Sequence, residues 1–288
     1  MMLHEQKFEL LIHKANPNAV NHFLPFCSDL WSYEVSNSTQ IYPTENLRDL
    51  GIIVSSDLCW ARHIKSMIDK SRAKASWILS VFKARDSLTM LTLYKSHVRS
   101  HLEYCCPLWH PSKISDIAAI EGVQRQFTKR INGYQSLSYW ERLAKLGLMS
   151  LQRRRERYIL LTMWKIYHQL VPNDLDVRFR SPSRLGLQAI LPDLPRTCSY
   201  VNRSLYENSF AVVGPRLWNA LPCKLSEVPD FDKFKNQLSK HLSSIPDEPP
   251  VIGYARVDNN SFPEASRRQR MTLQQEDIQG IRRSREAR

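Results

Sequence analysis

The sequence predicts a mainly α-helical protein, with short β-strands near its N-terminus and irregular, proline-rich segments among its later helices. Apolar residues recur every three or four positions over most of residues 58–170, which is the spacing of amphipathic helices. The chain has 288 residues and is 42% hydrophobic, so it can bury a substantial core. It has only 8 glycines and lacks the glycine-rich phosphate-binding motifs, which argues against an enzyme that cradles phosphates in such a loop.

Two stretches in the first part of the chain have the composition of β-strands. Phe8–His13 is predicted to form a short strand, and Leu50–Val54, with two Ile and a Val, is predicted to form a buried one. Ser55, Ser56 and Asp57 then offer a turn and a helix N-cap.

Three amphipathic helices are predicted next, at about residues 58–84, 87–104 and 115–131. Asp86 or Ser87 caps the second helix, and two prolines separate it from the third. Because their apolar stripes match in length, we expect the helices to pack as a three-helix bundle. The stripes are Trp60, Ile64, Met67, Ile68, Ala75, Ile78, Leu79 and Phe82; Leu91, Tyr94, Val98 and Leu102; and Ile117, Ile120, Phe127 and Ile131.

Three further helices are predicted in the second half of the chain. Ser138 and Glu141 have the spacing of a capping box at the start of a short helix that ends near Lys145. Ser150 is a suitable N-cap for a longer helix that ends at about residue 170. Residues 231–242 have the pattern of a small amphipathic helix.

Other segments lack a helical period. Residues 171–229 are rich in Pro, Asn and Ser and are predicted to be irregular. Within them, the stretch GPRLWNALP at residues 214–222 is too turn-rich for a helix interior and too apolar for an ordinary loop. Residues 246–288 are predicted to be largely disordered.

Positive charge is concentrated in the helical block. The whole chain carries +13, and residues 57–170 contain 20 Lys and Arg against 8 Asp and Glu. Such a block is typical of a module that binds a polyanion, although a solvated basic surface is the alternative. The candidate phosphate contacts are Arg62, Lys65, Arg72, Lys74, Arg125, Lys129, Arg130, Arg153, Arg154 and Arg155. The arginines from 153 onward oppose the dipole of their helix, which favours a functional role over a solvated helix start.

The cysteines and histidines indicate no cofactor. The 6 cysteines include no C-x-x-C pair and do not resemble a disulfide framework. His97, His101 and Cys105 have a spacing that permits zinc, but we interpret them as helix surface and core edge and expect no metal. Cys105 and Cys106 are interpreted as buried structural thiols. With no signal peptide and no membrane span in view, we expect an intracellular protein, nuclear or cytoplasmic.

Five segments, in order, resemble the reverse transcriptase of LINE-type (non-LTR) retrotransposons. They are NLRDLGIIVSSDLCWARHI, LYKSHVRSHLEYCCPLWHP, IEGVQRQFTKRI, RLAKLGLMSLQRRRERYILLTMWKIYH and SFAVVGPRLWNALP, and the resemblance extends over roughly residues 5–243. It implies a remnant of the polymerase palm at 1–56, a thumb-like helical bundle at 57–135, a C-terminal region at 136–245 and a basic tail at 246–288.

The same resemblance marks several residues as structural motif positions. These are Leu50, Gly51, Trp109, Gly214, Pro215, Trp218, Asn219, Leu221 and Pro222. We expect Trp218 and Leu221 to pin a loop to the helical body, with stacking on nucleic acid as the alternative.

The sequence departs from the family at the catalytic centre. Polymerases of this class hold two metal ions with paired aspartates, and no Asp-Asp pair occurs here. The Asp-x-Asp pairs Asp174/Asp176 and Asp230/Asp232 are interpreted as turn and capping residues. We therefore expect no polymerase activity from this chain alone.

The expected function is binding of nucleic acid, as a template–primer duplex or RNA, through the basic helices. Association with an intact polymerase core is a further expected partnership. The alternatives are a helical scaffold that binds protein and a retroelement fragment without function.

Overall fold

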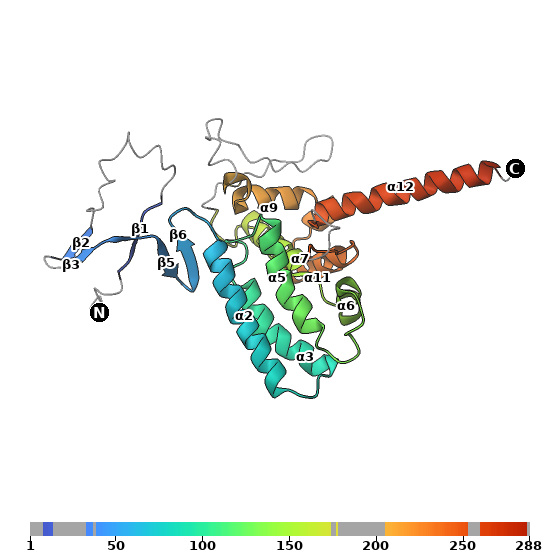
Figure 1. Ribbon diagram of the computed structural model, residues 1–288. Helices are drawn as coiled ribbons and strands as arrows, with labels where there is room; N and C mark the ends of the chain where they lie inside the picture. The colour runs from blue at the N-terminus through green and yellow to red at the C-terminus, as the bar shows by residue number, and fades with distance from the viewer. Residues whose placement is uncertain are drawn as a thin grey trace. The chain divides into compact units, whose positions relative to one another are not determined.

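The structure is a computed structural model that describes residues 8–13, 33–36, 39–173, 177, 205–252 and 260–286. The described chain is mainly helical, as expected (Figure 1). It divides into two compact units, residues 1–67 with 195–206 and residues 68–194 with 207–288. The second unit therefore combines most of the expected thumb-like bundle with the C-terminal region and the tail.

The described strands of the first unit form two-stranded pairs. The pairs are β1 (Leu10–Leu11) with β4 (Pro43–Thr44), parallel; β2 (Tyr33–Ser36) with β3 (Thr39–Ile41), antiparallel; and β5 (Asn46–Asp49) with β6 (Ile52–Ser55), antiparallel. The expected strand at 8–13 is thus reduced to β1.

The β5–β6 hairpin corrects the expected strand at 50–54. Leu50 and Gly51 have φ angles of 45° and 89°, so they form the turn rather than the strand. Because Asp49 pairs directly with Ile52, only a tight turn with left-handed residues fits between them. Leu50 is consequently exposed, while Ile52 is buried.

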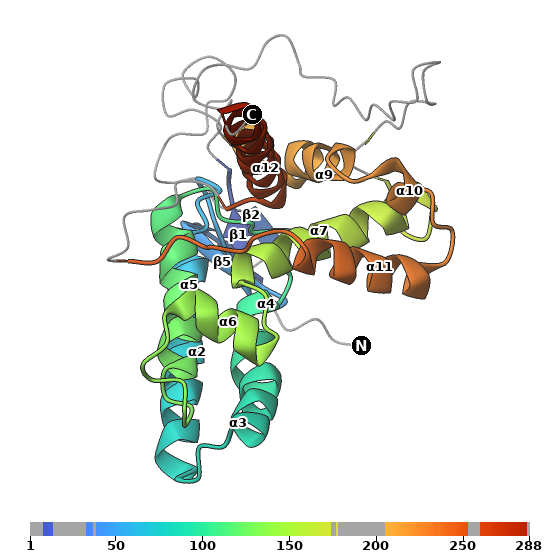
Figure 2. The ribbon, with the colours of Figure 1, turned by 90° about the vertical axis from the view of Figure 1, so that its right-hand side faces the viewer.

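The three expected helices are present. The first begins in the first unit and continues into the second, and the other two lie in the second unit. The first is α2 (Ala61–Val81), and the third is α5 (Ile114–Thr128). The second is a continuous run of α3 (Ser87–Leu93), the π-helical segment η2 (Tyr94–Val98) and α4 (Arg99–Glu103). Figures 1 and 2 show α2, α3 and α5 side by side. The expected inward faces are correct: Ile78, Tyr94 and Phe127 are buried, and the rings of Tyr94 and Phe127 lie 5.1 Å apart between centroids.

Helix caps were predicted well because they depend on local sequence. Asp86 accepts a hydrogen bond from the Thr89 N–H at 2.9 Å. Ser138 and Glu141 form both bonds of the capping box of α6 (Tyr139–Leu146). Ser150 accepts from the Arg153 N–H at 3.0 Å at the start of α7 (Leu151–Tyr167). The start of α2 differs, because the helix begins at Ala61, four residues after the expected Asp57 cap.

A second group of helices packs on α7. It consists of α9 (Phe210–Asn219), α10 (Cys223–Ser226), α11 (Phe231–Ser243) and α12 (Phe262–Glu286). Figure 2 shows α9 and α11 on either side of α7. Their shared core centres on aromatic rings: Trp218 and Phe234 lie 5.9 Å apart, as do Trp164 and Phe234.

The GPRLWNALP stretch is helical up to Asn219, so the expectation that it lies outside a helix is wrong. Pro215 sits inside α9 and removes one backbone donor, but it is buried, and packing offsets that loss. Gly214 allows close approach, because a Cβ there would come within 2.7 Å of the Met163 Sδ on α7. Trp218 and Leu221 are buried, as expected, although Trp218 belongs to a helix rather than a loop.

The expectation of a disordered tail is wrong for residues 262–286, which form α12. Phe262 and Ala265 are buried in the same core as α7 and α11. The Phe262 N–H donates to a carboxylate oxygen of Glu156 at 3.0 Å. Residues 267–272, which follow this first turn, are exposed.

Candidate nucleic-acid interface

Cationic side chains surround a hollow between α2 and α5. Arg72 comes from α2, Arg85 from the connection to α3, and Lys129 and Arg130 from the C-terminal end of α5. The hollow has a volume of about 560 Å³, and among the described residues no Asp or Glu lines it. We call this site the basic hollow. Cations without interspersed carboxylates produce a strong local positive potential.

The helical repeat places the α2 residues of the basic hollow on one side. Arg72, Ser76 and Leu79 follow the i, i+4, i+7 spacing that aligns side chains along a helix face. Ala75 and Phe127, both buried, also line the hollow, so part of its wall is apolar while its cations are exposed or half-buried. Guanidinium groups in this setting suit the binding of phosphate oxygens.

Arg85 is held in place at the end of the basic hollow. Its Nη2 donates to the Leu79 carbonyl at 3.3 Å, and its own carbonyl accepts from the Asn132 N–H at 2.9 Å. The second bond ties the C-terminal end of α5 to the α2–α3 connection. Sequence reasoning missed Arg85 because it lies outside the helical period.

The structure brings together three of the ten predicted contacts, Arg72, Lys129 and Arg130, in the basic hollow. Within the described chain, no carboxylate forms an ion pair with any of these three side chains. Arg62, by contrast, pairs with Glu45 at 3.6 Å, with both side chains largely exposed.

The other predicted contacts on α2 and α5 lie outside the basic hollow. Lys65 is exposed on α2. Lys74 lines a separate hollow on the opposite side of α2. Arg125 is half-buried, and its Nη1 donates to the Ile252 carbonyl at 3.2 Å.

The predicted role of Arg153 in phosphate binding is wrong, because its side chain is fully buried. Its guanidinium donates to the carbonyls of Leu242, Pro246 and Asn260 at 3.2, 3.0 and 3.3 Å. It also lies 3.5 Å from a carboxylate oxygen of Glu156. Arg153 therefore fastens three separate points of the C-terminal chain to α7.

Arg154 also has an internal partner, which weakens its candidacy for phosphate. It forms a bidentate ion pair with Glu103 on α4. Its Nη2 lies 2.8 Å from Oε2, and its Nε contacts Oε1. Both side chains are largely buried, and Tyr158 bonds to the same carboxylate at 3.2 Å. This pair connects α4 with α7.

Arg155 is fully buried, so the expected phosphate contact is wrong there as well. Its charge interacts with the buried carboxylates of Glu121 and Glu156. Burial raises the pKa of each carboxyl to about 7, while the neighbouring arginines lower it. These groups form an internal charged cluster, which explains how an arginine run is tolerated at the start of a helix.

The nearby His110 and Cys106 belong to the same interior. Burial, with a smaller effect of the Arg155 charge, lowers the pKa of His110 to about 3. Burial raises the pKa of the Cys106 thiol to about 12, so the thiol is protonated at neutral pH. Cys105 differs from expectation, because it is exposed.

The histidine–cysteine spacing does not form a metal site in the described chain. α4 ends at Glu103, and Cys105 has a φ of 48°, so it does not continue the face of His97 and His101. No group of three His, Cys, Asp or Glu able to hold a metal occurs among the described residues.

Asp230 caps α11 by accepting from the Lys233 N–H at 2.7 Å, as expected. Asp174 and Asp176 lie outside the described residues.

The remaining motif tryptophan, Trp109, is fully buried, and its Nε1 donates to the Tyr104 carbonyl at 2.8 Å. Of the other motif residues, Asn219 is exposed at the end of α9, and Pro222 is the N-cap residue of α10.

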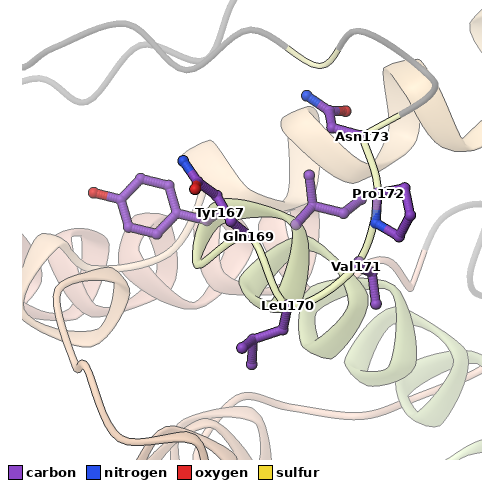
Figure 3. A pocket seen from close by; sticks show the side chains of 7 residues that line it. Tyr167, Gln169, Leu170, Val171, Pro172 and Asn173 are labelled. Atoms are coloured by element: carbon purple, nitrogen blue, oxygen red, sulfur yellow. The ribbon is translucent and has the colours of Figure 1, made fainter.

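A further hollow follows the end of α7 (Figure 3). It has a volume of about 580 Å³ and is lined by Ile166, Tyr167, Gln169, Leu170, Val171, Pro172 and Asn173. Gln169 has a φ of 57°, and the Asn173 side-chain oxygen accepts a hydrogen bond from the Val177 N–H at 3.0 Å. Among the described residues that line this hollow, none is charged.

No protein-family model, curated protein or solved structure matches this chain. In the described part of the chain, no helix has both the length and the apolar character needed to cross a bilayer.

Proposed function

We propose that the protein binds nucleic acid through the basic hollow, as a reverse-transcriptase-like protein that does not itself polymerise. The observation that carries this proposal is the convergence of Arg72, Arg85, Lys129 and Arg130 with no carboxylate among the described lining residues. The side chains come from three separate points in the sequence, so the fold, and not only the composition, concentrates the charge.

The arrangement favours contacts with a phosphate backbone over contacts with bases. The cations flank a partly apolar wall and can approach phosphates from two helices. Such contacts position a nucleic acid without recognising its sequence. Binding should therefore be tighter for an RNA–DNA or RNA duplex than for free nucleotides, and weakly dependent on sequence.

The resemblance to non-LTR reverse transcriptases supports the same proposal from the sequence. The thumb of such enzymes packs along the template–primer duplex. The resembling segment at 120–131 covers most of α5, whereas the segment at 46–64 reaches only the first four residues of α2. Because the sequence has no Asp-Asp pair, primer extension with Mg²⁺ or Mn²⁺ should yield no product from this chain alone. Association with an intact polymerase core, inside the nucleus or the cytoplasm, is part of the proposal.

The direct experiment compares two variants that remove equal charge. Arg72→Gln/Lys129→Gln/Arg130→Gln removes three cations from the basic hollow, and Lys233→Gln/Lys235→Gln/Lys240→Gln removes three exposed cations from α11. Affinity for a fluorescent RNA–DNA duplex is measured for both. The proposal requires a large loss in the first variant and a small one in the second. Equal losses would show that only net charge matters.

A helical scaffold for a protein partner is the competing function. Exposed apolar side chains such as Leu88 and Leu108 would suit such a role. Binding to nucleic acid weakens steeply with salt, whereas an apolar protein interface does not, so the salt dependence of binding separates the two functions.

A further inference from the structure

A large aromatic side chain stands exposed on α2, away from the basic hollow. Trp77 is 56% exposed. It lines a second hollow of about 470 Å³ together with Lys70, Ala73 and Lys74 of α2 and His101 of α4. We call this site the tryptophan hollow. Among the described residues, no carboxylate lines it.

The helical repeat explains how these side chains come together. Lys70, Ala73, Lys74 and Trp77 follow the i, i+3, i+4, i+7 spacing, which places them on one face of α2. The small Ala73 side chain lies one turn from Trp77 and leaves space beside the indole. The two lysines flank that space, so an apolar ring is bordered by positive charge.

Core packing does not account for Trp77. Its neighbours Ala75 and Ile78 are buried and supply the inward face of α2 at this level, whereas the indole points outward. An exposed indole leaves a large apolar area in water, which is unfavourable unless a partner covers it. The surrounding lysines indicate that the partner carries negative charge.

We propose that the tryptophan hollow binds an unpaired nucleotide of a single-stranded RNA or DNA, whose base stacks on Trp77 while Lys70 and Lys74 contact the adjoining phosphates. This inference rests on the proposed function. Base–aromatic stacking combined with a cationic groove is the general chemistry of single-strand binding. A base inside a duplex has both faces covered by its neighbours, so an internal base can stack on the indole only when it is unpaired.

The position of the tryptophan hollow relative to the basic hollow indicates which nucleic-acid structure the two sites bind together. At 100° per residue, Arg72 and Ser76 face one side of α2, and Lys70 and Trp77 face the other. A single helix therefore presents phosphate contacts on one side and a stacking platform on the other. That arrangement fits a junction at which a duplex continues into a single strand.

The experiment uses the full chain with three oligonucleotides: a single strand containing 2-aminopurine, the same strand with abasic sites, and a blunt RNA–DNA duplex. Trp77→Ala should weaken binding of the first by about fivefold to a hundredfold and abolish the quenching of 2-aminopurine fluorescence. Trp77→Phe should retain most of the affinity, since it keeps an aromatic face. Blunt duplex binding should be unchanged in both variants.

Leu88→Ala is the matched control, because it removes another exposed apolar side chain from the same unit. Leu88→Ala should change the affinity for neither the single strand nor the blunt duplex. Circular dichroism should show that all the variants are folded. Native affinity of Trp77→Ala for the single strand would overturn the inference, as would equal affinity of the native protein for the abasic strand. If the native protein bound neither the single strand nor the duplex, the proposed function itself would fail.

Discussion

Glu121 on α5 accepts a hydrogen bond from the backbone N–H of Gln152, the second residue of α7, at 2.8 Å. The first N–H groups of a helix have no partner within it, so this carboxylate caps α7 from another helix. Its second oxygen accepts from the Tyr139 hydroxyl at 2.7 Å. Glu121 therefore connects α5, α6 and α7 at one buried point.

The first prediction concerns the pH dependence of stability. Burial raises the pKa of the Glu121 carboxyl from 4.5 to about 7 in the folded protein. Between these values the folded state binds more protons than the unfolded state, so the contribution to stability is present below pH 4.5 and is lost as pH rises through 7. Glu121→Gln should remove this component and change the slope of unfolding free energy by about 1.4 kcal/mol per pH unit.

Urea denaturation at several pH values between about 5 and 7 measures this slope. Glu156 contributes with the same sign, and His110, whose pKa is lowered to about 3, contributes with the opposite sign below pH 6.5. Glu156 and His110 both remain in the variant. The difference in slope between the native protein and Glu121→Gln therefore isolates the contribution of Glu121. Parallel pH profiles would contradict the assigned pKa.

The second prediction follows from the buried position of Arg153. Arg153→Met should destabilise the protein by about 3–5 kcal/mol, because it removes the nearest cation from the buried carboxyl group of Glu156. Adding Glu156→Gln should restore part of this loss, since the two residues are coupled. The exposed Arg216 on α9 is the control, and Arg216→Gln should cost no more than about 0.5 kcal/mol. A similarly small loss of unfolding free energy for Arg153→Met would contradict the conclusion that Arg153 holds the C-terminal chain on α7.

The third prediction contrasts two helical glycines. Gly214→Ala should destabilise by about 1–3 kcal/mol, because its Cβ would meet the buried Met163 side chain. Gly122→Ala on α5 should be neutral or stabilise by up to about 1 kcal/mol, since a Cβ there meets nothing within 4 Å. Thermal denaturation of both variants checks the pair. The account of α9 packing on α7 fails if the two glycines behave alike.

The fourth prediction tests the docking of α12. Phe262→Ala should cost about 3–5 kcal/mol, as expected for a large ring removed from a core. Met271 lies on the same helix and is 55% exposed, so Met271→Ala should change the unfolding free energy by less than about 0.5 kcal/mol. Equal and small effects would show that the tail does not pack on the core.

Much of the fold could be predicted from local pattern. The apolar stripes through Ile78, Tyr94 and Phe127 repeat over several turns, and the caps Asp86 and Ser138 act within three residues of their position. α9 and α12 escaped prediction because long-range packing overrides local signals there. Pro215 opposes a helix locally, and Phe262 and Ala265, which lie in the core, are followed by exposed residues at 267–272.

The candidate site could be predicted only in part. Composition drew attention to Arg72, Lys129 and Arg130, which the fold brings together, but it did not distinguish them from the buried Arg153. The partners of Arg153 lie about ninety or more positions further along the chain, and no local rule connects them. Trp77 was missed because it lies outside the apolar stripe of its helix, and its exposure becomes evident only in the structure.

The salt dependence of duplex binding tests the central claim most directly. Each phosphate contact contributes a slope of about −0.9 in log K against log salt. Titration of an RNA–DNA duplex between about 50 and 200 mM salt should therefore show a steep slope for the native protein. Arg72→Gln/Lys129→Gln/Arg130→Gln should flatten that slope by about two to three units, while the α11 triple variant keeps it. A native slope in the basic-hollow variant, with folding intact, would contradict the claim that this surface binds nucleic acid.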